Sequence, residues 1–240
     1  MTSLEQLLVV QAHDTALDQL RHRRATLPER ELISGATGVL RELEAPIAET
    51  RARRDAVHRD VKRLEDEAEA ARDKAKAVDT TMYSGSVTSA KELQAMQADL
   101  EQIQHHQRTL EDRELEFMEI QELVDGELGV LDQQVAQAEA VITRARAVIA
   151  EQEAIIDAEI EAEETARSVT AAGVPADLLA LYEKCRSANR GAGVAKLIGH
   201  TCQGCRLTIP ASEVDRIRHA PEGAPASHCD NCGAILVPSV

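Results

Sequence analysis

Four cysteines in two pairs carry the most specific chemistry in this 240-residue sequence. Cys202 and Cys205 form one Cys-x-x-Cys pair, and Cys229 and Cys232 form a second pair after 23 intervening residues. Two residues between cysteines allow a tight turn to present both sulfurs to one ion, and two such turns supply four thiolates in a tetrahedron. The sequence therefore predicts one structural Zn²⁺ bound by these four side chains.

Other uses of the four cysteines fit the sequence less well. Four thiolates would also suit iron, so the ligands alone leave that metal open. A redox Cys-x-x-Cys pair usually begins a helix in an α/β pattern, which this chain lacks. Disulfides are not expected without an evident secretion signal. Because four thiolates leave no position for water, a catalytic zinc is not expected either.

The residues around the cysteines have plainer roles. Gly204 and Gly233 are expected to supply the positive φ angles that the metal-binding turns need. The fifth cysteine, Cys185, is either a redox-sensitive thiol or a small buried residue, and we favour burial. Three histidines near the motif are expected at the surface or beside the ligands, because four cysteines already saturate the ion: His200, His219 and His228.

Residues 194–240 are predicted to form a small β zinc ribbon. Its short apolar pieces predict strands at 194–198, 207–209 and 235–237. So few apolar residues make a small core, so metal binding should supply much of the folding free energy. A short helix and a glycine-rich linker are expected at 173–193.

Residues 1–172 have the pattern of a long helical hairpin. Apolar residues recur at heptad spacing on both sides of residues 79–92, and the two series mirror each other about a point between Gly85 and Ser86. The mirror places Val61 opposite Leu110, an a position against a d position, as an antiparallel coiled coil requires. The predicted fold is therefore mainly α: an antiparallel coiled-coil hairpin with its tip at 79–92, followed by the ribbon.

The ascending arm of the hairpin contains several helix-weakening residues. A first helix is expected over 3–27, and Pro28 is suited to start a second helical piece. Gly35 and Gly38 should weaken that piece, and Pro46 should kink it. The descending arm contains no proline before residue 175, so a continuous helix is expected there.

The charge of the chain disfavours nucleic-acid binding along the hairpin. The net charge is −15, and residues 91–170 hold 20 acidic and 6 basic side chains, which repel a phosphate backbone. A basic series on the ascending arm faces residues 111–119 under the mirror, so we expect interhelical ion pairs rather than a nucleic-acid surface. That series is Arg51, Arg53, Arg54, Arg59, Lys62 and Arg63.

A second apolar row follows the descending helix, outside the heptad positions. A wide apolar face usually packs against protein, so we favour a third helical segment or a drift of the helix face, with a groove for a partner helix as the alternative. The row consists of Leu115, Met118, Leu123, Val130, Val141, Val148 and Ile155.

The tip and the cysteines together resemble a known family. Tyr83-Ser84-Gly85-Ser86-Val87, then Lys91-Glu92-Leu93-Gln94, followed by two Cys-x-x-Cys pairs, resembles the bacterial C4-type zinc-ribbon proteins with a coiled-coil hairpin. Ser89-Ala90 stand where that family often has Asn-Pro. The resemblance implies an adaptor role, since some members are linked to the transcription machinery or to flagellar gene control. A nucleic-acid role is often suggested for the family, which offers no catalytic residues to carry over.

We therefore expect a non-enzymatic adaptor that binds protein partners through the tip and the ribbon. Tyr83 either contacts a partner or merely covers the turn. The expected tip contacts are Met82, Tyr83, Ser84, Gly85, Lys91 and Glu92. The alternative is a nucleic-acid-binding regulator that uses basic residues of the ribbon, namely Lys196, Arg206, Arg216 and Arg218.

Other classes of function lack support in the sequence. No arrangement of catalytic residues or phosphate-binding loop stands out, so neither an enzyme nor a small-molecule substrate is expected. No apolar run reaches the roughly 18 residues of a membrane span. A cytoplasmic location without a membrane partner is the default expectation.

Overall fold

The computed structural model describes residues 2–189, 191–221 and 225–239. Contacts divide the chain into two compact units, each treated separately below. The base unit comprises Met1–Arg30 and Arg146–Val240, and the shaft unit comprises Glu31–Ala145. The domain boundaries expected near residues 172 and 194 stay predictions, because these units divide the chain differently.

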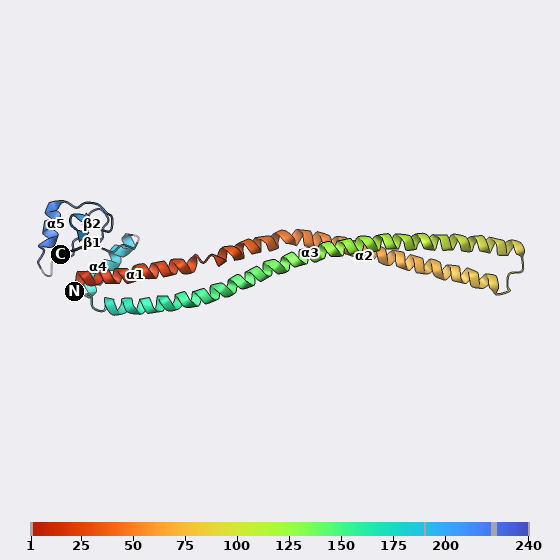
Figure 1. The fold of residues 1–240 in the computed structure, drawn as a ribbon, viewed down its shortest axis with the longest axis horizontal. Helices are drawn as coiled ribbons and strands as arrows, with labels where there is room; N and C mark the ends of the chain where they lie inside the picture. The colour runs from red at the N-terminus through yellow and green to blue at the C-terminus, as the bar shows by residue number, and fades with distance from the viewer. Residues whose placement is uncertain (1, 190, 222–224, 240) are drawn as a thin grey trace. The chain divides into compact units, whose positions relative to one another are not determined.

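Long helices dominate the described residues (Figure 1). No helix in the described ranges is both long and apolar enough to cross a bilayer. The elements are α1 (Ser3–Ala25), α2 (Glu29–Tyr83), α3 (Ala90–Ala171), α4 (Ala176–Ala188), β1 (Val194–Ile198), β2 (Thr201–Cys202), α5 (Ala211–Arg218) and β3 (Ile235–Pro238).

Helix α2 begins directly after Pro28, as predicted, but it continues through all three expected weak points. Gly35, Gly38 and Pro46 all lie inside the continuous helix. An internal proline costs about 3 kcal/mol through its missing hydrogen bond and steric clash. Leu43 and Thr50, which flank Pro46, are buried, and this packing on both sides outweighs the local preference. The predicted second helical piece after Pro28 is confirmed, since α1 ends at Ala25 and α2 begins at Glu29. Gly35 and Gly38 do not end the helix, and the kink at Pro46 stays a prediction.

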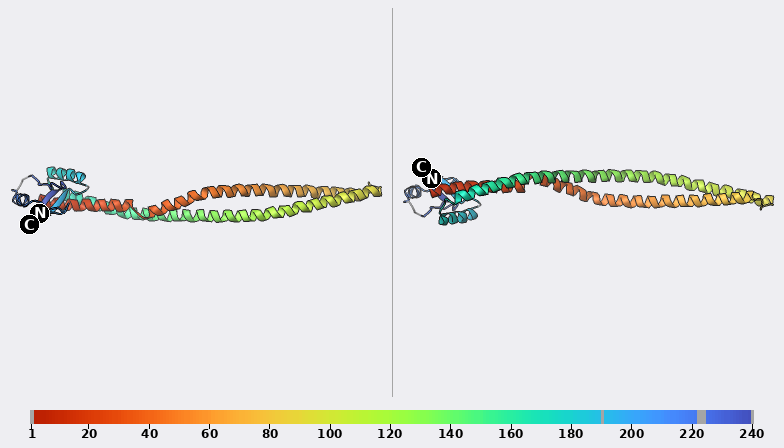
Figure 2. Two further views of the ribbon diagram at one scale, coloured as in Figure 1. Left: turned by 90° about the horizontal axis from the view of Figure 1, so that it is seen from above. Right: turned by 90° about the horizontal axis from the view of Figure 1, so that it is seen from below.

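The shaft unit is an antiparallel coiled coil of α2 and α3, which run side by side (Figure 2). Its buried residues recur at intervals of three and four along both helices, as coiled-coil packing requires. On α2 they include Leu64, Ala68, Ala71 and Ala75, and on α3 Leu100, Leu110, Val124 and Leu128. The predicted hairpin-like coiled coil followed by a small sheet is confirmed.

The register of the two helices differs from the predicted mirror. The mirror places Phe117 opposite Arg54, but in the structure Phe117 packs against the cluster that contains Leu64 and Leu110. Leu64 lies ten residues nearer the tip than Arg54. A heptad pattern matches almost equally well after a shift of seven residues, so apolar spacing alone does not select the register. The predicted register is therefore wrong by about one heptad.

The basic residues of α2 also have other partners than those predicted. Arg53 contacts Glu127 at 2.9 Å, and Arg51 lies 3.8 Å from Asp132. Both acidic partners lie outside the expected range of 111–119. The shifted register explains the difference, because it brings later residues of α3 beside this part of α2.

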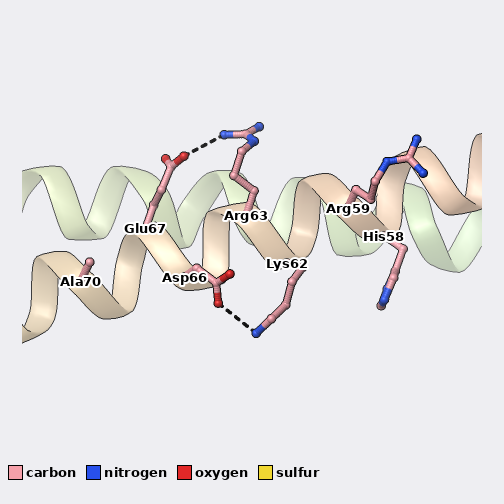
Figure 3. Close-up of a pocket in the computed structure, with 7 residues that line it drawn as sticks. All are labelled: His58, Arg59, Lys62, Arg63, Asp66, Glu67 and Ala70. Atoms are coloured by element: carbon pink, nitrogen blue, oxygen red, sulfur yellow. Dashed lines mark hydrogen bonds and ion pairs between the residues drawn. The ribbon is translucent and has the colours of Figure 1, made fainter.

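The remaining basic residues of this series pair mainly within α2 itself (Figure 3). Lys62 contacts Asp66 at 3.0 Å, and Arg63 contacts Glu67 at 3.1 Å, one helical turn away. Arg59 makes no ion pair with any residue that the structure describes. Exposed pairs of this kind contribute little to stability, because water and salt screen them. These pairs balance the local charge of α2. Because both members of each pair lie in the same helix, they do not set the register between α2 and α3.

The base unit contains a three-stranded sheet in the order β2-β1-β3. β1 pairs with β2 antiparallel and with β3 parallel. The first and third predicted strands are confirmed, but the strand expected at 207–209 is wrong. Thr208 forms only an isolated bridge with Thr201.

Helix α5 was not predicted, although its local signals were present in the sequence. Pro210 precedes it, Glu213 lies in its first turn, and Arg216 and Arg218 lie in its last turn. Val214 and Ile217, three residues apart, form its buried side. These features are typical of a short amphipathic helix.

We predict that Gly126→Ala and Gly129→Ala each stabilise the shaft unit. A Cβ atom at either position would meet no atom within 4 Å, and glycine inside a helix is about 1 kcal/mol less favourable than alanine. Urea unfolding followed by far-UV circular dichroism should show gains of up to that size. A loss of stability in either variant would contradict the open outer face of α3. Gly204→Ala serves as a control that should not increase stability, because the added Cβ would lie 3.1 Å from the Cβ of Ala195.

Candidate metal centre

The structure brings the four predicted cysteines together. Their sulfur atoms all lie within 4.8 Å of one another. The Sγ atoms of Cys202 and Cys232 are 3.9 Å apart, and those of Cys205 and Cys229 are 3.7 Å apart. A tetrahedral zinc with bonds of about 2.3 Å requires sulfur separations of about 3.8 Å. The geometry therefore fits one zinc ion with four thiolate ligands.

The two cysteine turns share one backbone design. In the first turn, the Arg206 N–H donates to the Cys202 carbonyl at 2.8 Å, and in the second the Gly233 N–H donates to the Cys229 carbonyl at 2.7 Å. Each donor lies four residues after the first cysteine and has a positive φ, 62° at Arg206 and 70° at Gly233. Each turn thus presents its two sulfurs on the same side, ready for a shared ion.

This design corrects the expected role of Gly204. Gly233 has the predicted positive φ, but in the first turn Arg206 rather than Gly204 occupies the left-handed region. Gly204 is needed for space: a Cβ there would lie 3.1 Å from the Cβ of Ala195 and 3.6 Å from the Cys202 sulfur. A left-handed conformation costs a non-glycine residue roughly 1–3 kcal/mol, so Arg206 is under strain.

The thiols differ in how readily they lose their protons in the metal-free protein. A hydrogen bond from the Leu207 backbone N–H lowers the pKa of Cys205 to about 7. Burial raises the pKa of Cys232 to about 12 and also raises that of Cys202. Metal binding must therefore release protons from buried thiols, so metal affinity should increase with pH.

The sheet has two apolar faces, and the cysteines belong to one of them. Leu236 of β3 faces a cluster that includes Cys202, Cys229 and the buried side of α5. Ile235 and Val237 alternate with it and belong to a second cluster with residues of α1 and α4. Alternate residues of a strand point to opposite faces. One strand therefore joins the metal-binding side to the helices of the base unit.

A buried carboxylate on α1 holds the polar part of this packing together. Asp14 accepts hydrogen bonds from the Tyr182 hydroxyl at 2.6 Å and from Arg167 Nε at 2.8 Å. Arg186 Nε lies 3.7 Å from it, and Arg167 also pairs with Glu183. These partners come from the end of α3 and from α4. The Asp14 carboxylate of α1 therefore links three helices through its hydrogen bonds and ion pairs.

Two close contacts connect the ribbon directly to these helices. The Val194 N–H donates to Gln11 Oε1 of α1 at 2.7 Å. A Cβ at Gly193 would lie 2.6 Å from the Tyr182 ring, so only glycine allows β1 to start this close to α4. The contacts of Asp14, Gln11 and Tyr182 could not be predicted from the sequence, because isolated polar groups on helices carry no spacing signal.

The other residues named from the sequence lie outside the metal cluster. His200 and His219 are exposed and His228 is partly buried, and none of them joins the described metal-binding group. Cys185 is buried in the cluster with α1, and burial raises its pKa. Burial rather than thiol reactivity is therefore the better account of Cys185.

The basic side chains of the ribbon are only partly free. Arg216 contacts Glu213 at 3.2 Å, and Arg218 donates to the Gly199 carbonyl at 3.0 Å. Lys196 and Arg206 are exposed. The four residues therefore do not present four unengaged charges to a phosphate backbone.

The tip of the shaft unit is a tight turn with an exposed aromatic ring. α2 ends at Tyr83, whose surface is 81% exposed, so the interpretation that this ring covers the turn is wrong. Gly85 has a φ of 76°, and the Ser84 and Ser86 hydroxyls lie 2.7 Å apart. Met82 is partly buried, whereas Ser84, Gly85, Lys91 and Glu92 are exposed.

The comparisons agree with this architecture. The chain belongs to the CT398-like coiled coil hairpin domain family, whose model matches residues 10–190. A C4-type zinc ribbon domain model matches residues 201–236. Together with the sulfur geometry, the ribbon match supports one structural zinc.

Relatives cover nearly the whole chain. An uncharacterized protein of Mycobacterium tuberculosis is 29% identical over 231 residues, which is 96% of this chain and 93% of that protein. A Mycobacterium smegmatis structure has a TM-score of 0.81 at 26% identity and covers 99% of this chain and 97% of its own. CT398 from Chlamydia trachomatis has a TM-score of 0.63 at 16% identity, with coverage of 99% and 98%, and shows the fold alone.

We predict that removing zinc loosens the whole base unit and leaves the shaft unit intact. The metal holds one face of the sheet while α1 packs on the other, and structural zinc contributes on the order of 10 kcal/mol. After chelation, hydrogen exchange measured by mass spectrometry should increase in the ribbon and in α1. Exchange in residues 50–130 should not change. Cys202→Ser should reproduce the effect, and Cys185→Ala should keep one zinc per chain; unchanged exchange in α1 would contradict the coupling.

We predict that Asp14→Asn destabilises the base unit and weakens its pH dependence. Burial alone would raise the pKa of Asp14, but hydrogen bonds from Arg167 and Tyr182 outweigh it and hold the pKa below its ordinary value. Its stabilisation is therefore present above pH about 4 and is lost as the pH falls through the lowered pKa. At neutral pH the loss should be about 3 kcal/mol.

The experiment uses a Tyr83→Phe background, in which Tyr182 is the sole tyrosine. Tyrosine fluorescence then reports unfolding of the base unit at pH 7 and at pH 3. The difference between Asp14→Asn and its parent should shrink at the lower pH. Asp18→Asn is the matched control, since its exposed pair with Arg186 should contribute less than about 1 kcal/mol. A difference that stays constant with pH would contradict the role of the charge.

Proposed function

We propose that this protein is a non-enzymatic adaptor whose zinc is structural and which binds protein partners through its tip and its ribbon. The observation that carries the proposal is the Tyr83 ring, 81% exposed at the end of a long coiled coil. Tyrosine is enriched in protein interfaces, because its ring is apolar and its hydroxyl forms hydrogen bonds. The ring lies at the end of a rigid pair of helices, where no hydrophobic core needs it for folding.

The use of aromatic residues in this chain strengthens the case for the tip. The sequence contains only two Tyr, one Phe and no Trp. Tyr182 is fully buried and Phe117 is packed in the shaft. The third aromatic residue, Tyr83, is exposed at the tip, where Lys91 and Glu92 are also exposed and offer both charges for polar contacts. This arrangement is typical of an apolar anchor with a polar rim.

The ribbon offers a second candidate contact surface. Ile198 is 51% exposed and Leu207 is 49% exposed, next to the exposed Arg206. Exposed apolar residues beside a strained, metal-fixed turn are suited to a partner because the turn is held before binding. A link to the transcription machinery rests on the family resemblance alone.

The nucleic-acid alternative has less support. Two of the four basic side chains of the ribbon are engaged with neighbouring residues. The ribbon also lacks aromatic residues for base stacking, which single-strand binding usually uses. Protein contacts therefore account better for the exposed residues at both sites.

We predict that Tyr83→Ala removes at least one partner without changing the fold. Affinity purification from native cells, quantified by mass spectrometry, should show a loss on the order of 30-fold for the tip partner, as truncation of an interface anchor costs about 2 kcal/mol. Lys91→Ala should cause a smaller loss. Leu32→Ala is the matched control, because Leu32 is also exposed, at 56%, but lies far from the tip in sequence. An unchanged set of partners for Tyr83→Ala would reject the tip as a binding site.

A further inference from the structure

The outer face of α3 carries an apolar row that the fold leaves uncovered. Leu115 is 59% exposed, Met118 48%, Leu123 69% and Val130 56%. The shaft unit has no third helical segment among its described residues, so the expectation that such a segment covers this row is wrong here. A drift of the helix face does not bury these residues either, since Val124 and Leu128 form the buried side.

The row has the dimensions of a helix-binding surface. From Leu115 to Val130 it extends for about 22 Å at 1.5 Å per residue. Leu123 and Val130 lie one heptad apart on the same side, with Gly126 and Gly129 between them. Side chains would meet nothing within 4 Å at either glycine. Partner side chains can therefore approach the backbone of α3 between the two exposed apolar residues.

The charge that α3 itself carries along this row is negative. From Glu114 to Thr143, α3 contains eight acidic residues and no Lys, Arg or His. Between Leu115 and Val130, four acidic side chains are exposed and take part in no ion pair found in the described ranges: Glu116, Glu119, Glu122 and Asp125. The apolar row is thus interspersed with unpaired carboxylates, since Glu122 lies one heptad after Leu115 and Glu116 one heptad before Leu123.

This charge selects among possible occupants. A second copy packed α3 against α3 would place carboxylates against carboxylates, which is unfavourable. A second copy packed through α2 would offer basic side chains near Lys62, but no large apolar side chain is exposed there among the described residues. A partner must provide both properties, namely apolar residues on one side and basic residues around them.

We propose that residues 115–130 of α3 form a docking site for a cationic amphipathic helix of another protein. Its apolar side covers Leu115, Leu123 and Val130, and its Lys or Arg residues pair with the carboxylates that lie among them. This is the helix-in-groove mode of recognition, with acidic residues supplying the choice of partner. The site includes no residue of the tip or of the ribbon, so it stands independently of the proposed function.

The test uses the full chain and a fluorescent 18-residue peptide of Leu and Lys with all Leu on one helical face. Fluorescence anisotropy should show saturable binding that weakens as salt increases. A peptide with Glu in place of Lys should not bind, and a Leu/Lys peptide with its Leu residues spread around the helix should bind at least tenfold more weakly. Equal binding of all three peptides would overturn the proposal.

Two pairs of variants locate the site. Leu123→Gln with Val130→Gln should weaken binding about tenfold or more, through the lost apolar burial. Leu32→Gln with Val39→Gln, which changes exposed apolar residues of α2, should have no effect. A double variant, Glu119→Gln with Glu122→Gln, should weaken binding and reduce its salt dependence. The control double variant, Asp99→Asn with Glu161→Gln, removes the same charge elsewhere and should change neither.

The outcomes separate the proposal from its rivals. Equal losses from both charge pairs would mean diffuse attraction to an acidic protein and would overturn a specific site. Sedimentation analysis should show the same mass for the wild type and for Leu123→Gln with Val130→Gln. A concentration-dependent dimer that these substitutions abolish would assign the face to a second copy and would also overturn the proposal. Far-UV circular dichroism confirms that the exposed substitutions keep the helix.

Discussion

The packing of one short sheet on both of its faces is the constraint on which the base unit depends. β3 has only four residues, yet Leu236 faces the cysteine cluster while Ile235 and Val237 face α1 and α4. Neither face alone is large enough to form a stable core. The metal and the helices therefore stabilise each other through a strand that belongs to both, and the ribbon is not an appendage of the hairpin.

The shaft unit follows a different principle. Its core is a narrow seam with many alanines, and its ion pairs are exposed and mostly local. Such a seam fixes the distance between the helices but contributes little surface burial per residue. Its stability grows with length, and its outer faces remain free for contacts with other molecules. The exposed row on α3 and the Tyr83 ring are therefore compatible with a shaft that needs neither for folding.

Much of this architecture could be predicted from local patterns. The four ligands of the metal centre follow from cysteine spacing, and the hairpin follows from apolar periodicity around residues 79–92. The register could not be predicted, because heptads match again after seven residues. Pro46 is tolerated inside a continuous helix because the residues on both sides of it are buried. The hydrogen bonds of Asp14 could not be predicted because they join residues up to 168 positions apart. The positive φ at Arg206 could not be predicted either, because the geometry of the metal-binding turn overrides the usual preference for glycine at such an angle.

The shared core of α1 and β3, which lie more than 200 residues apart, has a consequence for synthesis. Leu7 and Val10 of α1 share a core with Ile235 and Val237, so α1 lacks these partners after it has left the ribosome until β3 has been made. At about 5–20 residues per second, α1 waits roughly 10–50 s with its apolar side uncovered. The shaft unit can form during this interval, since its contacts are closer in sequence. Zinc capture by all four cysteines can follow only once Cys229 and Cys232 have been made, shortly before β3 completes the base unit.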